Sequence, residues 1–210
     1  MILLCVGLTG GIASGKSTVS RLLKEKGIPF IDSDKIARDL VHPGSEMLSE
    51  IIKIFGPDVL QADGALDRAS LGQIVFAREA KRRELEGLSH PRIMATQDRW
   101  LEQMKVLGDS PAAVVDAALL IESGGWRRFD RIVVVDCDES HQIDRFVGRE
   151  GMDEEAARVR IASQVPLVEK AKYADWLVDN RGSLDNLKEQ ADKLAAWLLE
   201  SAPIKKKKSN

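Results

Sequence analysis

Short apolar runs alternate with longer amphipathic stretches at the start of the chain. Residues 2–8 form a continuous apolar run, and residues 17–26 then show helical spacing that Gly27 ends, as a glycine after a helix commonly does. A second apolar run over residues 28–31 leads into helical spacing over residues 33–41. Strands that alternate with helices in this way predict an α/β protein with a parallel sheet and helices on both of its faces.

The pattern changes between residues 42 and 107, where no strand pattern is found. Helical spacing there covers residues 46–55, 70–76, 80–88 and 92–107. His90-Pro91 is expected to begin the last of these helices, with the proline in the first turn. A stretch of this length is too long for a loop, so we expect a helical insertion in the sheet domain.

Strand patterns return in the last half of the chain. Residues 113–115 and 131–135 are apolar, and they are followed by Asp116 and Asp136. Ligands of open α/β sheets bind at the carboxyl ends of strands, so these acids mark a candidate binding edge. The remaining pattern predicts helices over 140–149 and 153–164, a strand over 176–178, and a helix from an N-cap at Ser183 to residue 199.

Composition excludes several classes of protein. The chain has 210 residues, of which 44% are hydrophobic and 30% charged, as in ordinary globular domains. Four of its 31 basic residues form a tail at 205–208, so the rest carries 27 basic against 33 acidic residues. This acidic balance predicts no nucleic-acid partner. No apolar run is long enough for a membrane span, and we expect a cytoplasmic protein with a disordered basic tail over 205–210.

The strongest chemical signal is a glycine-rich loop between the first strand and the first helix. Residues 10–17 read Gly-Gly-Ile-Ala-Ser-Gly-Lys-Ser and fit the pattern G-x-x-x-x-G-K-[ST]. In such a loop the backbone N–H groups and the helix N-terminus hold phosphates, Lys16 adds a positive charge, and Ser17 offers a hydroxyl to Mg²⁺. We therefore predict ATP and Mg²⁺ as cofactors, with these nucleotide contacts: Gly11, Ile12, Ala13, Ser14, Gly15, Lys16, Ser17 and Thr18.

Acidic side chains near the predicted loop leave two interpretations open. Asp32 and Asp34 follow the second strand, where one of them could take a proton from a phosphoryl acceptor or cap the next helix. Asp116 stands where a Walker B acid would orient Mg²⁺, or it caps the following turn. Glu122 could belong to the same polar cluster.

Arginines on a predicted helix are the other charged candidates. Arg145 and Arg149 lie at i and i+4, so they share a helix face and could close over a triphosphate. The alternative is a solvated face that pairs with Asp144 or Glu150. Arg68 and His90 have no functional pattern of their own.

Taken together, these residues resemble the dephospho-CoA kinase family. The motifs that carry the resemblance, besides the loop itself, are Asp-Ser-Asp at 32–34, Leu-Asp-Arg at 66–68, His-Pro at 90–91, Leu-Leu-Ile-Glu at 119–122, Gln-Ile-Asp-Arg-Phe-Val-Gly-Arg at 142–149, Gln-Val-Pro at 164–166, Ala-Asp at 174–175 and Asp-Asn at 179–180. The resemblance covers residues 2–200. It is far more specific than the phosphate loop, which many families share.

The resemblance implies a P-loop kinase-like three-layer fold around a five-stranded parallel sheet. The core would comprise residues 1–41 and 108–204 and include a small lid at about 140–165, with 42–107 as the helical insertion that binds the CoA part. The implied reaction is transfer of the ATP γ-phosphoryl group to the ribose 3′-hydroxyl of dephospho-CoA, giving CoA and ADP. The sequence sets no oligomeric state.

The expected site residues fall into four groups, in which the roles of Asp34, Thr9, Arg68 and Asn180 are implied by the resemblance. Asp34 would be the catalytic base, with Lys16 and Arg145 also catalytic. The acceptor would meet Thr9, Asp34, Arg68 and His90, while Arg149 and Asn180 would contact ATP. Ser17 and Asp116 would bind the metal.

Two residues depart from the family pattern. Ala13 stands where glycine is frequent, and its small size predicts little effect. Ala118 stands where proline is usual, which predicts a looser turn behind Asp116.

Alternatives remain beside this reading. Another P-loop kinase for a nucleotide or small molecule would share the core, but Leu-Asp-Arg and His-Pro argue against it. A GTPase lacks its Asn-Lys-x-Asp motif here. A non-catalytic nucleotide-binding scaffold is disfavoured because Lys16, Asp34 and Asp116 are all present.

Overall fold

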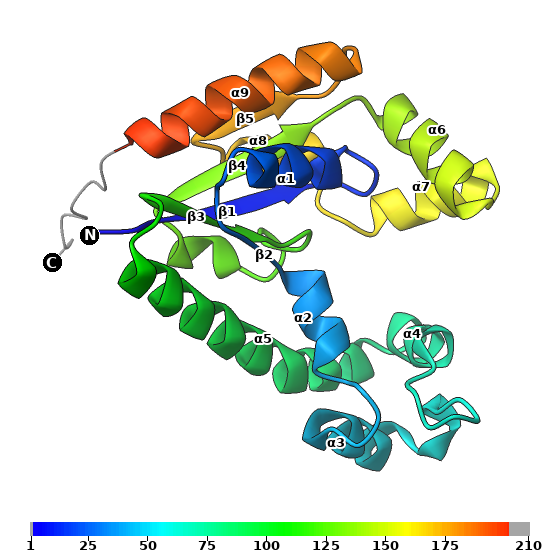
Figure 1. Cartoon of the computed structure of the whole chain (residues 1–210). Helices are drawn as coiled ribbons and strands as arrows, with labels where there is room; N and C mark the ends of the chain where they lie inside the picture. The colour runs from blue at the N-terminus through cyan, green and yellow to red at the C-terminus, as the bar shows by residue number, and fades with distance from the viewer. Residues whose placement is uncertain (1, 202–210) are drawn as a thin grey trace, which may run out of the picture. The chain divides into compact units, whose positions relative to one another are not determined.

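A five-stranded sheet forms the centre of the computed structural model, which describes residues 2–201 (Figure 1). In chain order the strands are β1 (Leu4–Gly10), β2 (Phe30–Asp32), β3 (Ala112–Asp116), β4 (Arg131–Asp136) and β5 (Trp176–Asp179). Their spatial order is β2-β3-β1-β4-β5, and β1 pairs in parallel with both β3 and β4. The predicted parallel sheet with flanking helices is confirmed. The predicted tail at 205–210 lies outside the described residues.

One face of the sheet is covered by α1 (Lys16–Glu25) and α9 (Leu184–Glu200), which lie side by side in Figure 1. Val6 of β1, Leu23 of α1 and Leu194 of α9 belong to the same buried cluster. Both faces of a central parallel strand are buried, which explains why β1 reads as a continuous apolar run.

The opposite face of β1 packs closely against the segment that follows β3. A Cβ atom added at Gly7 would lie 2.6 Å from the Leu120 side chain and 3.0 Å from that of Phe129. The glycine therefore admits this segment, which contains the 3₁₀ helix η2 (Gly125–Arg128), close to the strand.

Three helices connect β4 with β5. They are α6 (Glu139–Glu150), α7 (Glu154–Ala162) and α8 (Leu167–Ala171). Ile143 and Phe146 of α6 pack against Ala157 of α7. The sequence analysis did not find α8, because a helix of five residues is too short to show a hydrophobic period.

The chain divides into two compact units, Asp32–Trp100 and the remainder. The unit Asp32–Trp100 contains α2 (Ser33–Asp39), α3 (Glu46–Phe55), the 3₁₀ helix η1 (Pro57–Val59), α4 (Arg68–Ala77) and most of α5 (Glu79–Leu107). Its own core consists of Val41, Met47, Leu48, Ile51, Val59, Leu66 and Leu71. The sequence analysis placed the insertion at 42–107, whereas this unit also includes α2.

The prediction of two helices, over 80–88 and 92–107, is wrong. Both stretches belong to α5, which continues through Pro91. A proline removes one helical hydrogen bond and crowds the preceding turn. Here the guanidinium of Arg92 donates to the carbonyl of Leu88 at 2.9 Å, so a carbonyl beside the interruption gains a side-chain partner. His90 accordingly lies in the middle of a helix and does not begin one.

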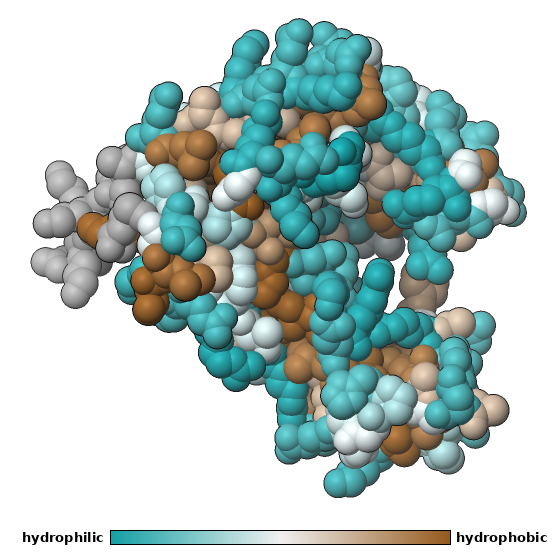
Figure 2. Space-filling model, viewed as in Figure 1, coloured by the Kyte–Doolittle hydropathy of each residue, from teal (hydrophilic) through white to brown (hydrophobic). Residues whose placement is uncertain are grey.

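Most exposed large side chains are polar, with local exceptions. Val106 and Leu107, at the end of α5, are 83% and 61% exposed, and Figure 2 shows apolar surface there. Within residues 2–201, no helix combines the length and hydrophobicity that crossing a membrane requires.

Candidate active site

The glycine-rich loop connects the carboxyl end of β1 with the start of α1. Gly15 precedes the helix with a φ of +95°, a left-handed conformation that glycine adopts without a steric penalty. The backbone N–H of Ser14 donates to the carbonyl of Gly11 at 3.1 Å, which closes the loop on itself. The Ser14 hydroxyl is buried without a hydrogen-bond partner. A buried donor without a partner is costly, and a phosphate oxygen held by the loop would satisfy it.

Ala13 has a φ of +55°, and it is the one non-glycine residue with positive φ in the part of the chain that the structure describes. The sequence analysis judged this position by size. The structure shows that backbone conformation is the stronger constraint, because a Cβ atom makes the left-handed region unfavourable by about 1–2 kcal/mol.

We expect Ala13→Gly to change the free energy of unfolding by less than about 1 kcal/mol, because relief of the strained φ is offset by the greater freedom of glycine in the unfolded chain. Ala13→Val should destabilise the protein more, because β-branched residues are strongly disfavoured at positive φ. Denaturant unfolding of both variants and of the unmodified chain measures the difference. Equal stability of the glycine and valine variants would contradict the left-handed conformation.

Lys16 lies against the acid at the end of β3. Its ammonium contacts Asp116 Oδ1, and the hydroxyl of Ser20, one turn further along α1, donates to Asp116 Oδ2 at 3.0 Å. The Lys16 and Asp116 side chains are 13% and 4% exposed. The structure therefore brings the predicted phosphate-binding lysine and the predicted Walker B acid together, and it adds Ser20, which the sequence analysis missed.

Asn180 and Arg145 reach the loop from two other segments. Asn180, just after β5, donates from Nδ2 to the Ser14 carbonyl at 2.7 Å. Arg145 of α6 donates from Nη2 to the Asn180 carbonyl at 3.1 Å and from Nη1 to the Ala13 carbonyl at 3.5 Å. Helix α6 and the segment after β5 thus meet at one side of the loop.

Arg149 does not share this contact. Its Nε atom donates to Glu150 at 2.7 Å, and its guanidinium lies 5.5 Å from the centre of the Phe146 ring. The two arginines that sequence spacing placed on one helix face therefore have different partners, because Arg149 is one turn further from the loop.

Two glutamines hold the loop at Ile12, and the sequence analysis noted them only as members of motifs that carry the resemblance, without assigning either of them to the site. Gln164 Oε1 accepts from the Ile12 N–H at 2.9 Å, and Gln142 Nε2 donates to the Ile12 carbonyl at 2.6 Å. The sequence held one indication for Gln142. It lies four residues before Phe146, so the two share the buried face of α6, where a polar side chain needs a hydrogen-bond partner.

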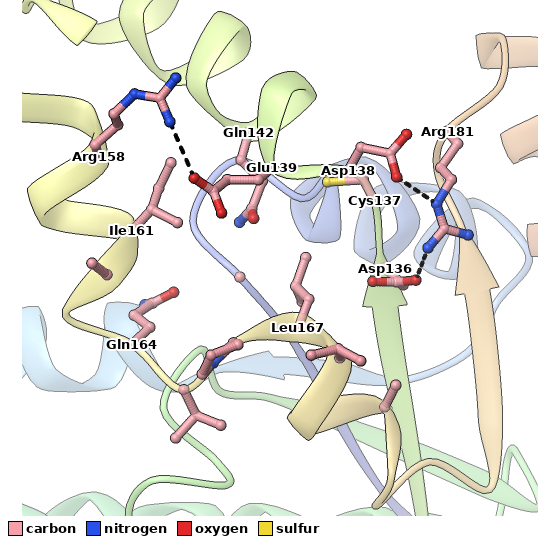
Figure 3. Close-up of a pocket in the computed structure, with 16 residues that line it drawn as sticks. Asp136, Cys137, Asp138, Glu139, Gln142, Arg158, Ile161, Gln164, Leu167 and Arg181 are labelled. Carbon is pink, nitrogen blue, oxygen red and sulfur yellow. Dashed lines mark hydrogen bonds and ion pairs between the residues drawn. The ribbon is translucent and has the colours of Figure 1, made fainter. Parts of the chain in front are cut away.

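These glutamines also line a cavity of about 590 Å³ between α6, α7, α8 and the end of β4 (Figure 3). Arg181 contacts Asp136 and Asp138 at one side, and Arg158 contacts Glu139 at the other. Both arginines that line this cavity, Arg158 and Arg181, therefore already have carboxylate partners. Burial raises the pKa of the Cys137 thiol in this wall to about 11, so it is protonated near neutral pH.

Thr9 is fully buried at the end of β1, one residue before the loop. Its hydroxyl donates to the carbonyl of Ala118 at 3.1 Å. This bond ties the strand to the turn behind Asp116, the turn that the sequence analysis expected to be loosened by the absence of proline.

The predicted acceptor residues Asp34, Arg68 and His90 belong to the unit Asp32–Trp100. Asp32 is the N-cap of α2, and its carboxylate accepts from the N–H groups of Asp34 and Lys35 at 2.7 and 3.2 Å. The choice that the sequence left open is settled for Asp32, and the exposed Asp34 carboxylate stays available for another role.

Arg68 is the first residue of α4, directly after the N-cap Asp67. The pKa of Arg68 is lowered, first by burial and then by the positive charge of Arg38. Two cations that repel each other favour the binding of an anion between or beside them.

Comparison with known proteins identifies the family. A model of the dephospho-CoA kinase family matches residues 4–186. A dephospho-CoA kinase from Symbiobacterium thermophilum is 47% identical over 192 residues, which cover 91% of this chain and 79% of the relative.

Two solved structures are similar over nearly their full length. The crystal structure of TT1252 from Thermus thermophilus aligns with a TM-score of 0.84 and 30% identity, over 96% of this chain and all of the other. A dephospho-CoA kinase from Campylobacter jejuni aligns with a TM-score of 0.68 and 28% identity, over 94% of this chain and 98% of the other. The similarity thus includes both units.

Proposed function

Because the chain belongs to the dephospho-CoA kinase family, we propose that it transfers the γ-phosphoryl group of ATP to the ribose 3′-hydroxyl of dephospho-CoA, giving CoA and ADP. The family match carries the identity of the acceptor. The observation that carries the reaction type is the glycine-rich loop with Lys16 and Asp116 side by side at its end. These groups are the ones that a phosphoryl transfer from a nucleoside triphosphate requires.

The nucleotide is held by the loop and by α1. The backbone N–H groups at the start of α1 would face the phosphates, and the Ser14 hydroxyl would gain the partner that it otherwise lacks. Lys16 neutralises charge that develops on the leaving β-phosphate. Arg145, whose guanidinium donates to the Asn180 carbonyl, would add a second positive charge, and Asn180, which donates to the Ser14 carbonyl, would contact the base.

Arg149 is proposed to join the nucleotide by exchanging partners. Its present partner Glu150 is exposed, so the ion pair contributes little, and a phosphate oxygen can replace the carboxylate. Closure of α6 and α7 over the phosphates would then exclude water, which otherwise competes as acceptor.

Mg²⁺ fits this site as an ion that arrives with ATP. Among residues 2–201, no group of three or more His, Cys, Asp or Glu side chains is placed to hold a metal ion. Mg²⁺ usually keeps several waters and binds one or two carboxylates together with substrate phosphates. The exposed Ser17 hydroxyl and the Asp116 carboxylate suit that coordination. When bound, Mg²⁺ neutralises charge on the β- and γ-phosphate oxygens.

The acceptor is proposed to bind the unit Asp32–Trp100. Asp34 would orient the 3′-hydroxyl and take its proton late in the transfer, because the transition state of such reactions is loose. Arg68 would bind an anionic group of the acceptor, and its repulsion by Arg38 supports this role. His90, within α5, is the remaining proposed contact.

The test measures ADP formation from Mg²⁺-ATP with dephospho-CoA, AMP or adenosine, or without an acceptor. We expect turnover that depends on dephospho-CoA and a product heavier by one phosphoryl group. Turnover only with AMP or adenosine would keep the kinase core but identify another P-loop kinase. ATP binding without turnover on any acceptor would instead favour a non-catalytic scaffold.

A further inference from the structure

Lys170 is a buried cation in the short helix α8, and no role has been assigned to it above. It is 0% exposed and stands first among the largest fully buried side chains. Lysine is almost never fully buried unless it is paired, because removal of its charge from water is costly. At this location the ammonium group needs hydrogen-bond acceptors and a negative charge that replace its contacts with water.

Three acceptors surround this ammonium group. Lys170 Nζ lies 3.2 Å from the carbonyl oxygen of Gly10, 2.9 Å from that of Ala118 and 2.8 Å from Glu122 Oε1. An ammonium group has three N–H donors, so each of them has a partner. Glu122 supplies the negative charge, and the two carbonyls supply the remaining hydrogen bonds.

The two carbonyls belong to the segments that carry the phosphate-binding groups. Gly10 ends β1 and begins the glycine-rich loop, and Ala118 lies two residues after Asp116. The Ala118 carbonyl also accepts from Thr9 at 3.1 Å. One side chain on α8 thus joins the start of the loop to the turn behind Asp116.

The same segment of chain contacts the loop at a second point. Gln164, six residues before Lys170, accepts from the Ile12 N–H, and the N–H of Val165 donates to Glu122 at 3.1 Å. The stretch 164–170 therefore contacts the first half of the loop at two points, Gly10 and Ile12. In the segment after Asp116, the same stretch contacts Ala118 and also Glu122.

Electrostatics agree with this geometry. Burial lowers the pKa of Lys170, and the positive charge of Lys16 lowers it further, whereas the hydrogen bond and the charge of Glu122 raise it. The two lysines are thus close enough to influence each other, although they lie 154 positions apart in the sequence.

We propose that Lys170 is a positioning residue for phosphoryl transfer, which holds the entry of the phosphate loop and the turn behind Asp116 at the spacing that Lys16 and Asp116 need. The proposal rests on the proposed function for its effect on turnover, but its effect on ATP binding does not depend on the acceptor. Lys170 would act through the carbonyls of Gly10 and Ala118, because these two and Glu122 already occupy its three donors.

The main test is Lys170→Met, which keeps an unbranched side chain that is one heavy atom shorter and removes all three donors. Lys172→Met is the control, because Lys172 lies two residues away, is 64% exposed and pairs only with Glu169 among its described contacts. For both variants and the unmodified chain, calorimetry gives the Kd of Mg²⁺-ATP, steady-state kinetics give kcat and each KM, and thermal melting reports the fold.

We expect Lys170→Met to lower kcat by about 10²-fold, because displacement of reacting groups by about 1 Å has an effect of that size. The Kd of Mg²⁺-ATP should rise, while the KM of dephospho-CoA stays unchanged. Lys172→Met should match the unmodified chain. A cooperatively melting Lys170→Met variant with the kcat and Kd of the control would overturn the proposal.

A second variant decides the matter if Lys170→Met fails to fold. Lys170→Arg keeps the charge but spreads its donors over a larger planar group, which cannot meet the same three acceptors from one point. A raised Kd of Mg²⁺-ATP supports the proposal, and an unchanged Kd and kcat overturn it. If the unmodified chain binds ATP but does not phosphorylate dephospho-CoA, the proposed function fails, and the Kd values alone still test Lys170.

Discussion

Lys16→Ala is expected to reduce turnover by at least about 10²–10³-fold, the effect of removing one preorganised group that stabilises charge in a transition state. The charge that builds up on the β-phosphate during transfer would lose the positive charge of Lys16. Binding of Mg²⁺-ATP should weaken as well, because the same charge acts on the phosphates before transfer. Kinetics with saturating dephospho-CoA, together with the Kd of Mg²⁺-ATP from calorimetry, measure both effects.

Stability must be measured in the same variant. Lys16 and Asp116 form a nearly buried pair, so removal of the lysine leaves a carboxylate at 4% exposure with the Ser20 hydroxyl as a remaining partner. Breaking a buried pair in this way costs about 3–5 kcal/mol. Lys24→Ala is a matched control, because Lys24 is exposed in the last turn of the same helix. Unchanged kinetics in Lys16→Ala would contradict the assignment of the phosphate loop.

Asp34→Asn is expected to lose about 10²–10⁴-fold in kcat, the usual contribution of a positioned general base. Asparagine keeps the size of the side chain but cannot take the proton of the 3′-hydroxyl. The fold should be preserved, because the carboxylate that caps α2 belongs to Asp32 and remains in place. The Kd of Mg²⁺-ATP should stay unchanged, so the loss would appear in turnover alone.

The control for Asp34→Asn is Asp39→Asn. Asp39 is exposed on the same helix and pairs with Lys35 at 2.6 Å, so its loss removes one surface ion pair of little weight. If Asp34→Asn and Asp39→Asn both kept nearly the kcat of the unmodified chain, Asp34 would be eliminated as the base. Equal losses in both variants would instead indicate a general effect of charge on α2.

Local patterns predicted the elements that depend on neighbours in the sequence. The run from β1 through the glycine loop to α1 lies within residues 4–25, and its strand, its turn and its helix each follow from residue types a few positions apart. The same holds for the cap at Ser183. The continuous α5 was predicted incorrectly, because Pro91 is a local stop signal that the longer helix overrides.

The candidate site was predicted only in part. Spacing and resemblance selected a set of site residues, but they assigned no role to Gln142, Gln164 or Lys170, although these three side chains contact the loop directly. A glutamine or lysine in a helical stretch has the composition of an ordinary surface residue. Their importance lies in burial and in partners more than a hundred positions away.

The sequence by itself determined the fold class, the phosphate-binding loop and the family, because these depend on residue types at short, regular spacings. Tertiary structure alone decided which distant groups meet: Lys16 with Asp116, Asn180 with Ser14, and Lys170 with Gly10 and Ala118. The physical reason is that a buried polar group must find its partners wherever the packed chain brings a donor or an acceptor within about 3 Å, and sequence separation does not limit that choice.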